Sequence, residues 1–202
     1  MPAREDGSAL ETIDAGRWKC PQAAKGTTLS AIREERIGLF LDSISLRHAS
    51  DVVEMRLDFK RLLALFRQRG RLVRAQYYAP SLPGGGANPQ KPLLDWLAFN
   101  GFSVVTCNSA HNDMATSALS LAVNISVDAM QLAQHLDHIV LVSQCRELHK
   151  LVEALKMMGK RVSVISTLRN HTVPDELRRQ ADEFLDLQDL RPILTADVTE
   201  NA

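Results

Sequence analysis

Two polar segments that directly follow apolar runs carry side chains able to do chemistry. The first is Asp42-Ser43-Ile44-Ser45, and the second is residues 143–147, Ser-Gln-Cys-Arg-Glu. If the apolar runs are neighbouring parallel strands, both segments leave the sheet at the edge where open α/β sheets bind their ligands. The helix expected after residues 143–147 adds unpaired backbone N–H groups, which favour an anion. The pattern therefore predicts one cleft between Asp42 and residues 143–147.

A third candidate, Asp128, lies inside an otherwise apolar helical stretch that runs from Leu121 to Met130. A carboxylate in such a place is exposed, paired, or directed into a cleft. Asn124 lies one turn earlier on the same helix face. We therefore keep Asp128 as a candidate and expect its partner to decide its role.

The elements that must position these residues alternate along the chain. Apolar runs predict strands at 36–42, 72–78, 102–106, 138–143 and 161–166, with a short edge strand at 184–187. Apolar residues at helical spacing predict helices between them, around 59–69, 93–99, 119–135, 148–158 and 174–182, and residues 80–89 and 108–117 are expected to be loops. Strands separated by helices indicate βαβ units and a mainly parallel sheet with helices on both faces. The predicted fold class is a three-layer, Rossmann-like α/β domain.

Composition limits the classes of function. The 202 residues carry 24 basic and 24 acidic side chains, which excludes a binder of nucleic acid that depends on a large positive charge. No apolar run is long enough to span a bilayer, and the acidic N-terminal segment contains no signal-peptide core. Three scattered cysteines fit a reducing compartment, so we expect a cytoplasmic protein. We expect an N-terminal tail at 1–34, one domain at 35–194 and a C-terminal tail at 195–202.

At this point the chain resembles a known family, the NYN domains, which are PIN-like nucleases of the LabA type. The family usually follows its first strand with Asp-Gly-x-Asn-Leu, and here residues 36–46 read RIGLFLDSISL. Further segments resemble the family in order and spacing: LVRAQYYAP, PLLDWLAFNGFSVVT, VDAMQLAQHLDHIVLVS, LVEALKMMGKRVSVIST and DELRRQADEFLDL. The resemblance covers residues 35–194. It implies metal-dependent cleavage of RNA, in which acidic residues hold Mg²⁺ or Mn²⁺ and the ion activates water.

The departures from the family are concentrated at the predicted site. Asp42 and Asp128 match family aspartates, whereas Ala122 stands where an aspartate is usual. The family's Ser-Gly-Asp-x-Asp-Phe is replaced by residues 143–148, Ser-Gln-Cys-Arg-Glu-Leu, so one carboxylate has become a thiol and another has become Glu147. The resemblance thus implies a remnant catalytic and metal site at Asp42, Asp128 and Glu147, in which ion binding is weak or lost. Ser45, Ser143 and Arg146 are the expected substrate-binding residues.

Three hypotheses about function follow. The first is a catalytically degenerate NYN protein that retains binding of RNA or of a protein partner. The second is an active Mg²⁺- or Mn²⁺-dependent ribonuclease that uses Asp42, Asp128 and Glu147. The third is an interaction module that binds no nucleic acid and works with another protein or as a homo-oligomer. No membrane partner is expected.

Individual residues carry alternative interpretations. Asp42 is also what a strand end or helix cap would place there. Arg146 could pair with a carboxylate and displace a metal ion. Cys145 at a helix start could have a lowered pKa and act as a nucleophile, although no Cys-x5-Arg phosphate loop follows it. Tyr77 and Tyr78 could stack on RNA bases, but strand tyrosines are more often core residues.

Overall fold

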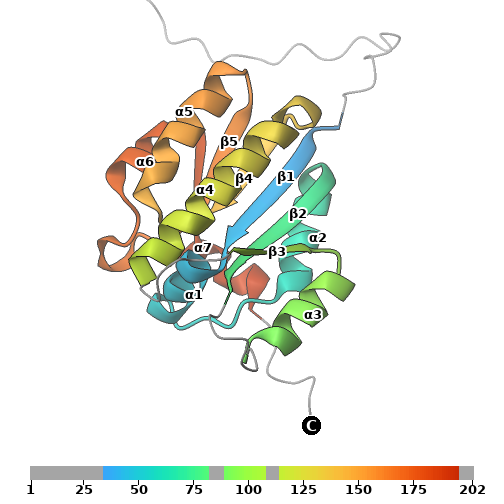
Figure 1. Ribbon diagram of the computed structural model, residues 1–202, viewed down its shortest axis with the longest axis vertical. Coiled ribbons are helices and arrows are strands. Elements are labelled where there is room, and N and C mark those ends of the chain that lie inside the picture. Colours follow the sequence, from blue (N-terminus) through green and yellow to red (C-terminus); the bar gives the residue numbers. More distant parts are fainter. Residues whose placement is uncertain (1–33, 82–88, 108–113, 196–202) are drawn as a thin grey trace, which may run out of the picture. The chain divides into compact units, whose positions relative to one another are not determined.

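The computed structural model describes residues 34–81, 89–107 and 114–195, and within them it contains one parallel sheet (Figure 1). Its strands are β1 (Arg36–Asp42), β2 (Arg71–Pro80), β3 (Ser103–Cys107), β4 (His138–Val142), β5 (Arg161–Ser166) and β6 (Glu183–Asp186). They lie in the order β3-β2-β1-β4-β5-β6, and every neighbouring pair is parallel. The order reverses between β1 and β4, and this is the switch point at which such sheets bind ligands.

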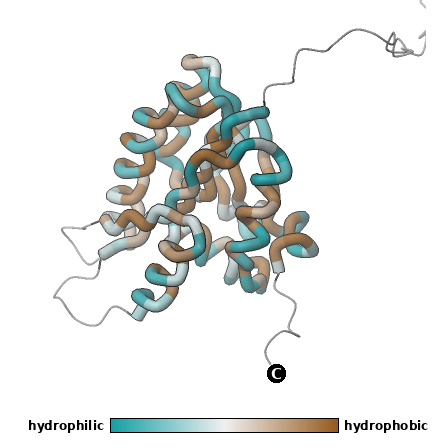
Figure 2. The backbone as a smooth tube through the Cα atoms, turned by 90° about the vertical axis from the view of Figure 1, so that its right-hand side faces the viewer, coloured by the Kyte–Doolittle hydropathy of each residue, from teal (hydrophilic) through white to brown (hydrophobic). Residues whose placement is uncertain are grey.

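Helices cover both faces of the sheet, which confirms the three-layer α/β prediction. They are α1 (Ser43–Val52), α2 (Phe59–Arg69), α3 (Lys91–Phe99), α4 (Met114–Leu132), α5 (His149–Met157), α6 (Asp175–Gln180) and α7 (Leu187–Leu194). One apolar core lies between the sheet and α1, α2, α3 and α7, and a second lies under α4, α5 and α6. Figure 2 shows the hydrophobic strands at the centre of the domain, between these layers.

The two central strands are buried on both faces, which is why they appear in the sequence as unbroken apolar runs. Every residue of β4 is buried, as are all residues of β1 after Arg36. Backbone pairing aligns Leu41 of β1 with Val142 of β4, so Asp42 and Ser143 follow as adjacent residues at the carboxyl edge. The predicted neighbourhood of the two strand exits is therefore confirmed.

Some boundaries differ from the sequence prediction. Helix α4 already begins at Met114, so the expected loop at 108–117 is wrong for its last four residues, and 108–113 lie outside the described residues. Helices α1 and α7 were not predicted, because each directly follows a strand without an intervening loop. The expected tails fall outside the described residues except for Glu34 and Thr195. None of the described helices is long and apolar enough to cross a lipid bilayer.

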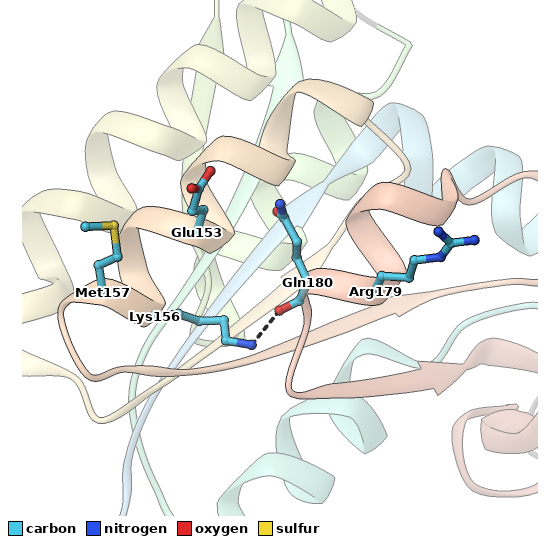
Figure 3. Close-up of a pocket in the computed structure, with 5 residues that line it drawn as sticks. All are labelled: Glu153, Lys156, Met157, Arg179 and Gln180. Atoms are coloured by element: carbon cyan, nitrogen blue, oxygen red, sulfur yellow. Dashed lines mark hydrogen bonds between the residues drawn. The ribbon is translucent and has the colours of Figure 1, made fainter.

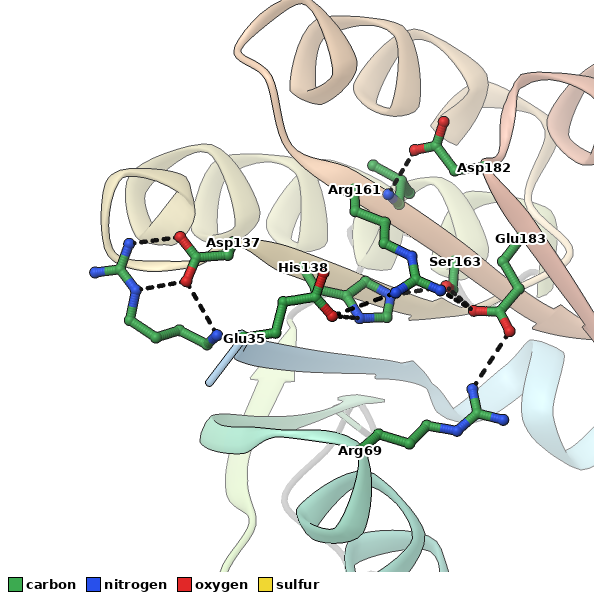
Figure 4. A network of polar contacts seen from close by, with 10 residues as sticks. Glu35, Arg69, Asp137, His138, Arg161, Ser163, Asp182 and Glu183 are labelled. Carbon is green, nitrogen blue, oxygen red and sulfur yellow. Dashed lines mark hydrogen bonds and ion pairs between the residues drawn. The ribbon is translucent and has the colours of Figure 1, made fainter. Parts of the chain in front are cut away.

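The amino edge of the sheet, opposite the predicted site, holds a buried polar network around His138 (Figure 4). His138 is 1 % exposed, and its Nε2 lies 2.7 Å from Ser163 Oγ, which donates to Glu183 at 2.8 Å. Arg161 pairs with both Glu183 and Glu35. Since the Ser163 proton goes to Glu183, Nε2 donates to Ser163 and Nδ1 of the neutral ring carries a lone pair, 3.4 Å from Glu35. The lone pair facing Glu35 is unfavourable, but burial and the nearby Arg161 charge oppose protonation more strongly, so the imidazole is neutral.

This network predicts an acid-sensitive stability. Burial lowers the pKa of His138 below its ordinary value of 6.5; Arg161 and Arg69 also lower it, and Glu35 and Glu183 oppose them. Because the unfolded chain then binds the proton more tightly, stability is complete above about pH 6.5 and falls as the pH drops toward the lowered pKa, by at most about 1.4 kcal/mol per pH unit. Urea unfolding between pH 7.5 and 5, as an approximate range, measures the slope.

The control for this prediction is the substitution of a neighbouring exposed histidine. His138→Gln is expected to flatten the dependence of stability on pH below about pH 6.5. His135→Gln, at an exposed position three residues earlier, is expected to leave that dependence unchanged. A slope that survives in His138→Gln would contradict the assignment to this ring.

Candidate functional site

Asp42, the first predicted site residue, is completely buried and fully hydrogen-bonded. Its Oδ1 accepts from the backbone N–H groups of Ile44, at 2.9 Å, and Ser45, at 3.2 Å. Its Oδ2 accepts from the hydroxyls of Ser45, at 2.5 Å, and Ser143, at 3.1 Å. A carboxylate has about four acceptor positions, so these four donors occupy all of them.

The local sequence explains this arrangement. Asp42 is the last residue of β1 and the N-cap of α1, and its carboxylate receives the first free N–H groups of that helix. Ser143 arrives from the neighbouring strand β4, and its Oγ also accepts from the N–H of Cys145, at 3.1 Å. The structure therefore brings Asp42, Ser45 and Ser143 together in one buried cluster, in which Asp42 is the cap of α1.

Asp128 lies in α4 and faces the sheet rather than solvent. Its Oδ2 accepts from the Tyr78 hydroxyl, at 2.8 Å, and from Gln76 Nε2, at 3.3 Å. Burial raises the pKa of Tyr78 well above its usual 10.0, and the hydrogen bond to Asp128 raises it further, so the phenol stays a donor. Asn124, expected on the same face, donates instead to the Ser120 carbonyl within the helix. Tyr77 and Tyr78 are buried, which confirms that they are core residues.

The buried thiol of Cys107, at the end of β3, lies within the electric field of both aspartates. Burial raises its pKa to about 11, and the charges of Asp128 and Asp42 add to the increase. Cys107 therefore stays protonated near neutral pH. A protonated thiol is a poor ligand for a hard cation, which prefers oxygen ligands, so Cys107 adds no cation ligand near the two aspartates.

The segment after β4 turns its charged residues outward. Residues Arg146–Leu148 form a short 3-10 helix, and Glu147 is exposed, with a hydrogen bond from Cys145 Sγ at 3.5 Å. Arg146 pairs with Glu176 of α6 at 2.6 Å, so it does pair with a carboxylate, but not with one of the three predicted ligands. Arg146 is therefore held away from Asp42.

Cys145 does not have the lowered pKa that was considered for a helix-start nucleophile. Burial raises the pKa of its thiol to about 11, and the side chain of Glu147 contributes to the increase, although the backbone at Glu147 opposes it. His149, the nearest candidate for a base, donates from Nδ1 to the Arg146 carbonyl at 2.8 Å. The alternative of an activated thiol is therefore not supported, because burial outweighs the opposing backbone contribution at Glu147.

The residues present do not form a cage for a divalent ion. Within residues 34–81, 89–107 and 114–195, no three His, Cys, Asp or Glu side chains lie close enough together to hold one. Asp42 has no free lone pair, Asp128 already accepts two hydrogen bonds, and Glu147 points to solvent. Mg²⁺ is usually bound through one or two carboxylates and several waters, and in this arrangement the oxygens of Asp42 and Asp128 already accept hydrogen bonds from the protein.

Two residues beside the site were not singled out from the sequence as candidates. Gln144 Oε1 accepts a hydrogen bond from His48 Nδ1 at 2.8 Å, and this contact links the β4 exit to α1. The other end of that amide, Nε2, is buried and has no hydrogen-bond partner. In the sequence Gln144 was visible only as a departure from the family glycine, and no pattern in the chain predicts that its amide lies against α1.

A cavity of about 480 Å³ lies elsewhere, between α5 and α6 (Figure 3). Its lining residues are Glu153, Lys156, Met157, Arg179 and Gln180. Lys156 donates to the Gln180 carbonyl at 2.8 Å and pairs with Asp182 at 2.9 Å, so its charge is already used within the fold. We do not assign the functional site to this cavity, because it is shallow and none of the predicted site residues lines it.

Comparison with known proteins agrees with this architecture. The chain is 25 % identical over 174 residues to the low amplitude and bright protein LabA of Synechococcus elongatus, across 81 % of this chain and 90 % of that protein. A crystal structure of a protein of unknown function from Vibrio parahaemolyticus has the same fold, with a TM-score of 0.66 and 21 % identity over 80 % of this chain and 98 % of that one. The model of the NYN domain family matches residues 36–188. The chain therefore belongs to the NYN domain family, and its domain is ribonuclease-like in fold.

Proposed function

We propose that this protein is a catalytically degenerate NYN domain that retains binding of RNA or of a protein partner and has weak or no phosphodiester hydrolysis. The observation that carries the proposal is the state of Asp42, whose two oxygens are enclosed by Ile44, Ser45 and Ser143. A ligand for Mg²⁺ or Mn²⁺ needs exposed lone pairs, and here these are used for a helix cap and two buried hydroxyls.

The replaced residues support the same proposal. Ala122 of α4 is packed into the apolar core under that helix, and Cys145 carries a protonated thiol, so the two positions where the family has carboxylates contribute no charged oxygen. Two of the three remaining carboxylates, Asp42 and Asp128, already accept hydrogen bonds from the protein's own side chains. We expect binding of a divalent ion to be weak or lost.

An RNA cleavage assay tests this proposal. We expect no Mg²⁺- or Mn²⁺-stimulated cleavage of single-stranded or structured RNA above the level of the Asp42→Asn variant, because that carboxylate does not reach a metal ion. Calorimetric titration of the wild-type protein with Mn²⁺ is expected to show no site. Cleavage that depends on a metal and is lost in Asp42→Asn would instead establish the active ribonuclease hypothesis.

The retained activity would then be binding. Fluorescence anisotropy with labelled RNA, together with pull-down before and after ribonuclease treatment, separates RNA binding from an RNA-independent protein partner. We further propose that the protein acts in the cytoplasm, as its unpaired cysteines indicate.

A further inference from the structure

Helix α4 presents an apolar surface to solvent. Leu119, Val123, Val127 and Met130 are 46 %, 62 %, 50 % and 40 % exposed. Their spacing of four, four and three residues places them on one helix face, along about 16 Å of the axis. We call these four residues the α4 stripe. Single exposed apolar side chains are common, but a continuous row on the longest described helix needs a physical explanation.

Helix α4 contributes no charged side chain to the face of the α4 stripe. Asp128 is the only ionisable residue among the 19 of α4, and it bonds inward to Tyr78 and Gln76. By contrast, α5 has lysine, glutamate and histidine side chains. A surface helix ordinarily has charged residues on its outer face, and α4 lacks them.

The polar side chains near the α4 stripe are already satisfied within the helix. Asn124 Nδ2 donates to the Ser120 carbonyl at 2.8 Å, and Ser126 Oγ donates to the Ala122 carbonyl at 2.7 Å. Removing water from this face would therefore strand neither of these donors. The usual cost of burying polar groups is small here, while burial of the four apolar side chains is favourable.

From this we propose that the α4 stripe is the contact surface of a homodimer, in which two copies of α4 pack antiparallel about a two-fold axis. An uncharged face is complementary to itself, whereas a charged partner would lose water and gain no counter-charge. The chain has a formal net charge of zero, so two copies approach each other without long-range repulsion. A two-fold interface uses the same patch on both copies, which one self-complementary helix face allows.

The expected affinity is modest. Stable interfaces bury about 800 Å² on each partner, and four apolar side chains on one helix face make up only part of such an area. We therefore expect a dissociation constant in the micromolar range. The inference is independent of the proposed function, because it holds whether or not the domain hydrolyses RNA.

Sedimentation velocity of the full chain over about 1 to 200 µM tests the proposal. We expect the wild-type protein to change from 22.4 kDa to twice that mass over this range. Val123→Lys and Val127→Lys are expected to weaken association at least about tenfold, since each places two like charges at the interface. Lysine favours helix more than valine does, and both positions are exposed, so the fold is expected to persist and circular dichroism checks this.

Met157→Lys is the matched control, because it makes the same kind of change at an 84 % exposed residue of α5. It is expected to leave association unchanged. A wild-type chain that stays monomeric over the whole concentration range would overturn the proposal, even if another molecule binds α4. A dimer that persists in both α4 variants would also overturn it, because the contact would then lie elsewhere.

Discussion

Replacing Asp42 by alanine is expected to lower the free energy of unfolding by about 3 kcal/mol. The change removes the cap of α1, worth about 1 kcal/mol, and it leaves buried donors of Ser45 and Ser143 without their charged acceptor. The two hydroxyls lie 3.3 Å apart and can pair with each other, which limits the loss. Urea denaturation followed by circular dichroism measures the change at constant pH.

Asp58 provides a matched control within the same chain. It caps α2 in the same way, and its Oδ1 accepts from the N–H groups of Lys60 and Arg61. It is partly exposed, and its carboxylate contacts these backbone groups and the Arg61 side chain, at 3.6 Å, rather than buried serines. Asp58→Ala is therefore expected to cost only about 1 kcal/mol, and the excess in Asp42→Ala measures the buried serine network.

The sign of the change in stability caused by Asp42→Asn distinguishes a carboxylate built into a metal site from one held by the protein's own donors. In a cluster of carboxylates built for a metal ion, removing one charge relieves repulsion and stabilises the metal-free protein. In the observed arrangement the charge is held by four donors, so its loss is expected to destabilise the fold. A higher melting temperature for Asp42→Asn in the absence of metal would show that the carboxylate is not held as described.

The second large effect concerns the thiol of Cys145, which is expected to react with a small disulfide reagent at least about tenfold more slowly in the folded protein than in urea. A rise of its pKa from 9.0 to about 11 lowers the thiolate population near pH 7 by about 100-fold. A more basic thiolate is intrinsically more nucleophilic, which recovers about a factor of ten. Mass spectrometry of the modified peptide assigns the rate to Cys145.

Two comparisons make this result specific. Glu147→Gln removes the neighbouring carboxylate and is expected to accelerate the reaction only slightly, because burial is the larger cause of the raised pKa. Cys107, whose pKa is also raised to about 11, is expected to be similarly slow. A folded-state rate at Cys145 above the rate in urea would mean an activated thiol and would restore covalent catalysis as a hypothesis.

The strands of the sheet could be predicted because they are more apolar than the segments on either side of them. Buried strands such as β1 and β4 are short apolar runs ended by polar residues, and even the edge strand β6 was expected within one residue of its position. Helices α1 and α7 were not predicted, since the aspartate that ends the preceding strand is also the N-cap of each helix and no loop separates the two elements. The adjacency of Asp42 and Ser143 depended on β1 and β4 being neighbours, a strand order that the sequence left open.

The roles of the candidate residues depended on details that a single sequence does not contain. Which side chains meet Asp128 is decided by the register of β2 and the rotation of α4, so its partners Gln76 and Tyr78 were not foreseeable. Glu147 was grouped with the aspartates by its place in the family pattern, but a 3-10 turn directs it outward. Substitutions in a motif are visible in the sequence, whereas the hydrogen bonds that Asp42 accepts from Ser45 and Ser143 are not.

The distance along the chain between Asp42 and Ser143 has a consequence for synthesis. The two residues are 101 positions apart, as are Arg36 and Asp137, which pair across the same central strands. At a translation rate of about 5–20 residues per second, roughly 5–20 s pass between the appearance of one partner and the other. During that interval β1 can pair with β2 but has an open edge on its other side. A nascent chain therefore holds its most buried carboxylate in water until the second half of the sheet emerges from the ribosome.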